Sequence, residues 1–407
     1  MSDSSLYRAR DFQVFLSARF LSTTAMMVQS VAVGWQVYAI SHSALALGFV
    51  GLSEFVPMFL LTLPAGEVSD RFDQRFVLAL ALALEAVCGL LLILLTLGHT
   101  HYVLPYYAVM AVFGFARAFS GPAAQSLLPF VVPPRDLPKS IAWSSSVFQV
   151  AVIAGPAIGG YAYYALGPVM AYALCAVCFF GAGAAVSILG GRRNEEITGE
   201  ASAFERVAEG VRFVRSRPVV LGAISLDLFA VLLGGATALL PIYARDILFV
   251  GPAGLGMLRS APAVGAALVA ILLGRRPLVR HAGRRMFGAV AVFGAATIAF
   301  GVSTNFYLSL VALAILGASD MISVFIRHAL VQFATPDGMR GRVSAVNMLF
   351  IGASNELGEF ESGLTAALFG TVPAVIIGGI GTLIVVGVWM ALFPPLRTVD
   401  RLAEVSA

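Results

Sequence analysis

Long apolar runs alternate with short polar segments along the whole chain. Each run has the roughly 20 residues that an α-helix needs to cross a bilayer core about 30 Å thick. The runs fall near residues 12–40, 44–67, 76–97, 103–131, 140–164, 168–189, 218–243, 252–274, 285–303, 306–334, 343–369 and 371–393. The pattern predicts twelve transmembrane helices and excludes a β-barrel, whose strands would alternate apolar and polar positions over about ten residues.

Composition agrees with this pattern. The chain has 407 residues, of which 59% are hydrophobic and 12% charged, whereas an ordinary globular domain has roughly 25% charged residues. Apolar surface on this scale needs the lipid bilayer as its partner. The fold class expected is an all-α membrane protein.

Basic residues predict the orientation of the chain in the membrane. Arg8 and Arg10 precede the first run, and every second loop after it is rich in Lys and Arg. Positive charge is retained in short cytoplasmic loops, so both termini are expected in the cytoplasm. The net charge of +4 follows from this topology, and no nucleic-acid partner is expected.

The longest polar stretch divides the chain. We expect an N-terminal six-helix bundle over residues 1–189, a cytoplasmic linker over 190–217 and a C-terminal six-helix bundle over 218–407. Within the linker, Val207 and Val211 recur at helical spacing and predict an amphipathic helix on the inner membrane surface. The alternative is a solvated linker whose arginines only enforce the topology.

The two halves share an internal repeat. Residues 114–160 align without a gap on residues 317–363, a shift of 203, which places Arg117 on Asp320. Only eight of the aligned positions carry the same residue. The matching order of apolar and polar segments is therefore stronger evidence for a repeat than the sequence identity is. The repeat predicts two pseudo-symmetric bundles.

A second comparison of the halves uses a shift of 208. It places Gly48 on Gly256 and Arg19 on Asp227. Basic residues of the first half thus correspond twice to acidic residues of the second. A pseudo-twofold axis along the membrane normal would place each arginine opposite its acidic counterpart across a central cavity.

The segment after the second run carries a motif. Gly66, Asp70, Arg71 and Arg75 have the spacing Gly, three residues, Asp-Arg and a nearby basic residue. This resembles the signature between the second and third helices of the major facilitator superfamily, which implies its fold of two six-helix bundles. Gly66 would permit close helix approach, and Asp70 with Arg71 would bond a helix end in the other half and latch the cytoplasmic side as a gating loop. The alternative is that the two arginines are only topology charges.

Two further segments resemble motifs of proton-coupled drug antiporters. Arg117, four residues before Gly121, is similar to their fourth-helix motif, in which a membrane arginine influences the protonation of a neighbouring acid. Ser120 stands where that motif usually has Gln.

The second of these segments lies in the fifth run. Gly155, Pro156, Gly159 and Gly160 form a sequence similar to the end of the antiporter motif of the fifth helix, which implies a helix hinge. The alternative is close helix packing through small residues without any role in transport direction.

Ionisable residues inside the apolar runs are the candidate functional residues, because charge in a bilayer costs several kcal/mol unless it is paired or faces water. They are Arg19, Glu54, Glu85, Arg117, Asp227, Arg259, Asp320, Arg327, Glu356, Glu359 and Glu361. The first choices lie on the first, fourth, seventh and tenth runs, whose helices line the central cavity in the superfamily. These are Arg19, Arg117, Asp227 and Asp320.

Glu54, Glu356 and Glu359 are the next candidates. Glu356 and Glu359 are three residues apart and share a helix face, and like charges so close favour protonation of one of them. A proton carrier needs this property. The alternative is a fixed structural network in which the acids pair with Arg259 or Arg327.

The stretch over residues 354–363, with the Asp-Arg motif, resembles the bacterial branch that contains the enterobactin exporter and related siderophore and macrolide exporters. The resemblance implies a monomeric multi-pass protein of the bacterial inner membrane. Its expected partners are a medium-sized organic substrate, siderophore or drug-like, and a proton as coupling ion. It would act by alternating access, with release linked to protonation of Asp227, Glu54 or Glu359.

Two alternatives to an exporter remain open. One is an importer or uniporter of a small organic solute on the same fold, and the other is a membrane sensor or assembly partner that does not transport. No enzyme is expected, because the sequence has no constellation of residues typical of a soluble enzyme. It also has no phosphate-binding Walker loop, so coupling to ATP by this chain is not expected. Its five histidines are scattered, so neither a metal nor a cofactor is expected.

Overall fold

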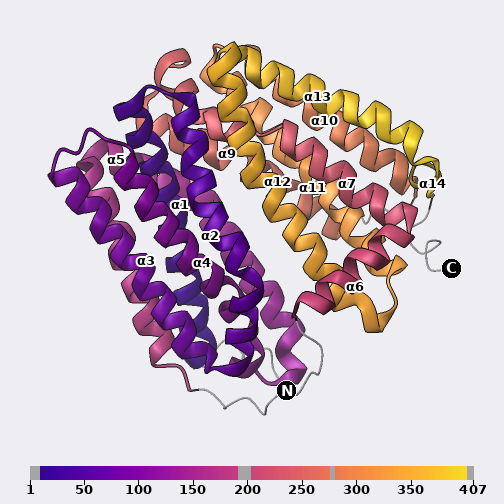
Figure 1. Ribbon diagram of the computed structural model, residues 1–407, viewed down its shortest axis with the longest axis horizontal. Helices are drawn as coiled ribbons and strands as arrows, with labels where there is room; N and C mark the ends of the chain where they lie inside the picture. The colour runs from indigo at the N-terminus through magenta and orange to yellow at the C-terminus, as the bar shows by residue number, and fades with distance from the viewer. Residues whose placement is uncertain (1–9, 191–202, 276–279, 401–407) are drawn as a thin grey trace. The chain divides into compact units, whose positions relative to one another are not determined.

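The computed structural model describes residues 10–190, 203–275 and 280–400 (Figure 1). These residues are helical almost throughout, and no strand occurs among them. Eight of their helices are long and apolar enough to cross a membrane. The predicted fold class, an all-α membrane protein, is confirmed.

The helices up to residue 187 cover the first six predicted runs. They are α1 (Arg10–Ser41), α2 (Ala44–Arg71), α3 (Gln74–Leu97), α4 (Leu104–Val131), the short η1 (Pro134–Asp136) and α5 (Leu137–Ser187). The runs 140–164 and 168–189 share α5, which breaks at Gly167 with φ 82°. Glycine adopts positive φ at little steric cost, and Pro168 follows it.

The remaining helices cover the other six runs. They are α6 (Ala203–Ser216), α7 (Pro218–Leu233), η2 (Ala236–Leu239), α8 (Leu240–Ile242), η3 (Tyr243–Ile247), α9 (Gly251–Arg275), α10 (Ala282–Val302), α11 (Phe306–Ala334), η4 (Asp337–Met339), α12 (Arg340–Phe369), α13 (Thr371–Leu392) and α14 (Pro394–Thr398). The run 218–243 is divided, because α7 ends at Leu233 and two glycines follow before the short turns η2 and α8.

The chain forms two compact units. The first unit comprises residues 1–42, 53–203 and 251–260, and the second comprises 43–52, 204–250 and 261–407. The boundaries therefore fall inside α2 and α9 as well as in the linker.

The core of the first unit lies where α5 packs along α1 and α3. Phe12, Phe15 and Tyr106 are fully buried there. Phe113 of α4 meets Phe179 of α5 edge to face, with the ring centres 5.8 Å apart.

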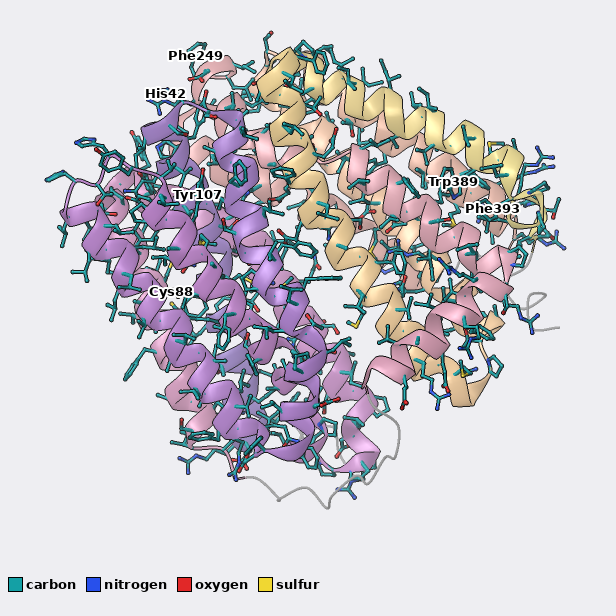
Figure 2. All side chains as sticks on the ribbon, in the orientation of Figure 1. His42, Cys88, Tyr107, Phe249, Trp389 and Phe393 are labelled. Atoms are coloured by element: carbon teal, nitrogen blue, oxygen red, sulfur yellow. The ribbon has the colours of Figure 1, made fainter. Side chains whose placement is uncertain are left out.

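The core of the second unit is formed by α7, α10, α11 and α13. Leu226, Met286 and Ile326 are completely buried in it. At one end of α13, where Figure 2 marks Trp389 and Phe393, the indole nitrogen of Trp389 donates a hydrogen bond of 2.9 Å to Ser225 Oγ of α7.

The predicted linker helix exists as α6. Its Val214 is buried with Val220, Val331 and Val343, and its Glu209 forms an ion pair with Arg342 of α12. The apolar face of α6 therefore packs against protein at Val214, which differs from a helix lying on lipid alone.

Close helix crossings repeat with the two sequence shifts. A Cβ atom on Gly114 would lie 2.9 Å from Cα of Glu54 in the first unit, and one on Gly317 would lie 2.6 Å from Cα of Pro262 in the second. Gly114 and Gly317 differ by 203 residues, and Glu54 and Pro262 by 208. Both units thus use glycine to bring equivalent helices together.

A second pair of crossings follows the same shifts. A Cβ atom on Gly160 would lie 2.9 Å from Cα of Gly256 within the first unit, and one on Gly363 would lie 3.0 Å from Cα of Gly48 within the second. The internal repeat inferred from the sequence is therefore a repeat of helix packing.

Candidate functional site

The first unit contains a buried charge cluster on α2, α3 and α4. Arg117 of α4 forms an ion pair with Glu54 of α2, and their side chains are 29% and 14% exposed. Gly114 lies one turn before Arg117 and lets the backbone at Glu54 approach α4 closely. The glycine crossing thus brings the guanidinium within reach of this carboxylate.

A second carboxylate joins this cluster from α3. Glu85 is 3% exposed, and Ser120 of α4 donates a hydrogen bond of 2.8 Å to its Oε1. Ser120 is three residues after Arg117, so the two side chains share a helix face. The first-unit cluster, Glu54, Glu85, Arg117 and Ser120, therefore has two carboxylates and one guanidinium.

The second unit contains a comparable cluster on α7 and α11. Asp227 of α7 forms an ion pair with Arg327 of α11, and both residues are almost completely buried. Asp320 and Ser323 precede Arg327 by seven and four residues and lie on the same face of α11. The second-unit cluster is thus Asp227, Asp320, Ser323 and Arg327, again with two carboxylates and one guanidinium.

A small pocket lies within the second-unit cluster. Its lining consists of Asp227, Ala230, Val231, Val290, Phe293, Asp320 and Ser323. The hydroxyl of Ser323 is buried and has no hydrogen-bond partner among the described residues. The pocket has room for about one water molecule.

Arg19, a first choice from the sequence, lies apart from the ion pairs. Its guanidinium carbon is 5.2 Å from the ring centre of Phe148, which is within the range of a cation–π contact. Its Nε is buried and has no hydrogen-bond partner among the described residues.

Glu356 and Glu359 of α12 converge on one point, as their spacing predicted. A Cβ atom on Gly51 would lie 3.5 Å from Oε2 of Glu356 and 3.1 Å from Oε2 of Glu359. The arginines considered as partners for the membrane acids have other contacts. Arg327 pairs with Asp227, and Arg259 donates a hydrogen bond to Ser30.

The predicted gating loop is in fact helical over most of its length. Gly66, Asp70 and Arg71 belong to α2, which ends at Arg71, and only Phe72 and Asp73 separate it from α3. The side chains of Asp70 and Arg71 lie outside the described part of the structure. Among the described residues of the first unit, a Cβ atom on Gly66 would meet no atom within 4 Å, so no close approach is formed between them there.

Asp73 is the residue that starts α3. Its Oδ1 accepts a hydrogen bond of 2.9 Å from the Arg75 amide, and its Oδ2 accepts one of 2.6 Å from the Arg75 guanidinium. These bonds lower the pKa of Asp73 below its usual value. Arg75 also donates a hydrogen bond of 2.7 Å to the Leu189 carbonyl just beyond α5. Arg75 thus bonds a helix end of its own unit.

The glycines of the predicted hinge are packing positions. A Cβ atom on Gly155 would lie 3.1 Å from Met27 Cγ, and one on Gly159 would lie 2.8 Å from Val28 Cα. Pro156 and Gly160 lie within continuous helix, and the non-helical residue of α5 is Gly167. A hinge at this segment stays a prediction.

Sequence reasoning ranked Glu85 and Arg327 below the residues that they accompany, and it missed Ser323. A signal for Ser323 was present, because Asp320, Ser323 and Arg327 recur at helical spacing in an apolar run. Ser120 was noted only as a departure from a motif, whereas it is the hydrogen-bond partner of Glu85.

Comparisons with known proteins agree with this architecture. The family model described as transmembrane secretion effector matches residues 2–407. Enterobactin exporter EntS of Citrobacter koseri is 24% identical over 396 residues, covering 95% of this chain and 92% of that exporter. EntS of Escherichia coli O1:K1 is 24% identical over 392 residues, covering 94% and 91%.

A solved structure has a similar fold. The crystal structure of a bacterial homologue of the human lysosomal transporter Spinster, in an inward-facing and occupied conformation, matches with a TM-score of 0.75 at 12% identity. The match covers 97% of both chains. At this identity the likeness concerns the fold alone.

Proposed function

Because the chain belongs to the transmembrane secretion effector family of major facilitator transporters, we propose that it is a proton-coupled exporter of a medium-sized organic molecule. It is a multi-pass membrane transporter and not an enzyme. The proposed exporter works by alternating access, with both termini in the cytoplasm of a bacterium.

The observation that supports proton coupling is that the first-unit cluster has two carboxylates but one guanidinium. Arg117 neutralises Glu54, while the hydrogen-bond partner of buried Glu85 is the uncharged Ser120 hydroxyl. A charged side chain within the membrane costs several kcal/mol unless it is paired. Protonation of Glu85 removes that cost, so the cluster is suited to gain and lose one proton.

Several predicted residues keep a proposed role in transport. Arg19, Asp227, Asp320, Glu356 and Glu359 are proposed to contribute to the pathway of substrate and protons, as the ionisable residues of spanning helices. Glu54 and Asp227 each form an ion pair with an arginine. Glu85 therefore replaces them as the proposed carrier in the first unit.

The substrate class and direction are supported by the relatives. Two of them carry the name enterobactin exporter, which favours export of a siderophore-like or drug-like molecule by this chain. The latch formed by Asp70 and Arg71 stays part of the proposal, since these residues end α2 where the topology predicts the cytoplasmic side.

The test uses purified protein in proteoliposomes that enclose a pH-sensitive dye, with enterobactin and a panel of amphiphilic drugs as probes. We expect at least one probe to move protons in the opposite direction to itself. Glu85→Gln should reduce the number of protons moved with each probe molecule. Glu361→Gln is the matched control, because Glu361 is also a membrane acid but accepts a hydrogen bond from Thr365 on its own helix.

Inverted membrane vesicles separate export from import. An exporter should accumulate the active probe inside inverted vesicles whose interior is acidified, because export from the cell is then import into the vesicle. Accumulation only in right-side-out vesicles would favour an importer. Wild-type protein that binds a probe but moves no protons with any of them would contradict the coupling.

A further inference from the structure

The charges of the second-unit cluster do not balance. Asp227 and Arg327 neutralise each other. Asp320 forms no ion pair or hydrogen bond with any of the described residues. The cluster lies in spanning helices, where an excess negative charge is costly. One positive charge is needed to neutralise it.

The pocket beside Asp320 is built to receive a small polar species. Ser323 lines the pocket and is 2% exposed, and its hydroxyl has no hydrogen-bond partner in the described part of the chain. Buried hydroxyls are normally hydrogen-bonded, so this one indicates a missing partner. The room for about one water molecule fits a water that bonds both Ser323 and Asp320.

The lining favours a proton over a metal cation. Apart from the two carboxylates and the Ser323 hydroxyl, the side chains around the pocket are Ala230, Val231, Val290 and Phe293. These walls are apolar and provide no oxygen side chain, whereas hard metal cations take about six oxygen ligands. A proton needs only one carboxylate oxygen.

We propose that this pocket is a second proton-binding site, in which Asp320 takes the proton and a single water links it to Ser323. A proton that reaches the pocket water as hydronium passes to a carboxylate oxygen of Asp320, which breaks one O–H bond of the hydronium, forms one O–H bond on Asp320 and leaves a neutral water, and the proton returns by the same route. Arg327 pairs with Asp227, which leaves Asp320 as the carboxylate that takes the proton. The role of the site in transport rests on the proposed function, but its protonation does not.

Few other titratable groups face the site. α7 contributes Asp227, α11 contributes Asp320 with Arg327 beside it, and α10 contributes only Val290 and Phe293. His328 follows Arg327 but its side chain is exposed. A carboxyl signal from this pocket can therefore be assigned to one of the two aspartates.

The test is infrared difference spectroscopy of the purified full-length protein in lipid nanodiscs during a pH titration. The carbonyl stretch of a protonated carboxyl group reports proton uptake without any substrate. We expect Asp320→Asn to lose one carboxyl band that wild-type protein shows, and Asp320→Glu to retain a band. Glu85→Gln should lose a different band, which shows that the method resolves single groups.

Two serines of α11 provide a matched control. Ser323→Ala should displace the Asp320 band, because it removes the partner of the bridging water. Ser319→Ala should leave the band unchanged, because Ser319 is buried on the same helix but donates its hydrogen bond to the Leu316 carbonyl at 2.8 Å.

Three results would decide whether the pocket is a proton-binding site and whether it serves transport. A spectrum of Asp320→Asn that keeps every wild-type band while Glu85→Gln loses one would overturn the site. Sodium that removes the band at constant pH would also overturn it, in favour of a metal cation. An Asp320 band in a protein that moves no protons with any probe would support the site and contradict the proposed function alone.

Discussion

The two units share one helical frame but place their buried charges differently. In the first unit, α4 provides Arg117, which pairs with Glu54 of α2. The equivalent positions in the second unit, by the shifts of 203 and 208, are Asp320 and Pro262. No ion pair can form between these two residues.

The second unit forms its ion pair elsewhere in the frame. Its arginine is Arg327, seven residues after Asp320, and the carboxylate is Asp227 of α7. Asp227 is equivalent to Arg19 of α1, which instead contacts the ring of Phe148. The glycine crossings are thus equivalent in the two units, whereas the charged residues that form the ion pairs stand on different helices. In the described part of each unit one carboxylate forms no ion pair of its own, Glu85 in the first and Asp320 in the second.

The largest expected effect concerns the two ion pairs. Arg327→Met should lower the free energy of unfolding by about 3–5 kcal/mol, because it leaves Asp227 charged and buried without a partner. Arg117→Met should cost less, since the side chains of that pair are 29% and 14% exposed, against 2% and 7% for Arg327 and Asp227. Unfolding in detergent followed by circular dichroism measures both.

A double variant separates the charge from the packing. Asp227→Asn combined with Arg327→Met should recover much of the stability lost in Arg327→Met, because the buried unpaired charge is gone. Equal losses for Arg117→Met and Arg327→Met would mean that the two pairs are not as different as their burial indicates.

The next largest expected effect tests whether the close helix crossings of the two units are equivalent. Gly114→Ala and Gly317→Ala each place a Cβ atom within 3 Å of a neighbouring backbone, so each should cost about 1–3 kcal/mol through a forced helix shift. Thermal unfolding of the two variants should give similar losses. Gly288→Ala is the control, because its Cβ would meet none of the described residues within 4 Å, and it should be neutral or slightly stabilising. A loss in only one unit would show that the crossings are not equivalent.

The smallest effect concerns the starts of α3 and α10. In the first unit Asp73 caps α3 from within its own turn. In the second, Asp400 near the end of the chain accepts a hydrogen bond of 2.9 Å from the His281 amide just before α10. Removing an acceptor at such a helix start costs typically about 1 kcal/mol. Asp73→Ala and Asp400→Ala should both lower the unfolding midpoint slightly, and an unchanged midpoint for either would count against its capping role.

The Asp73 cap also predicts a pH dependence. The hydrogen bonds from Arg75 lower the pKa of Asp73 in the folded protein, so the stabilisation is present above the unfolded value of about 3.9 and is lost as the pH falls through the folded pKa. The pair is exposed, so the effect is below about 1 kcal/mol. Asp73→Asn should remove it, and unfolding midpoints of both proteins across this acidic range measure the difference. Identical pH profiles would contradict the assignment.

Much of the frame could be predicted from the sequence, because spanning helices reveal themselves by long apolar runs. The run at residues 306–334 coincides with α11. The end of α2 could not be predicted in this way, because the helix continues for several polar residues beyond its apolar run and ends only before the cap at Asp73.

The clusters could be predicted only in part. Membrane depth identified Glu54, Arg117, Asp227 and Asp320 as candidates, since charge there is rare. Their partners depend on how each helix is rotated and where glycines let neighbours approach, and a single sequence does not contain that information. Glu85 was therefore undervalued until the structure placed Ser120 beside it.

The proton-to-substrate ratio tests most directly the claim that each unit carries its own protonatable carboxyl group. It is measured in proteoliposomes as the substrate gradient that balances an imposed pH gradient, for wild-type protein, Glu85→Gln and Asp320→Asn. We expect one proton for each of the two carboxyl groups in the wild type, and a ratio lowered by one in each variant that still transports. A ratio that is the same in all three proteins would contradict it.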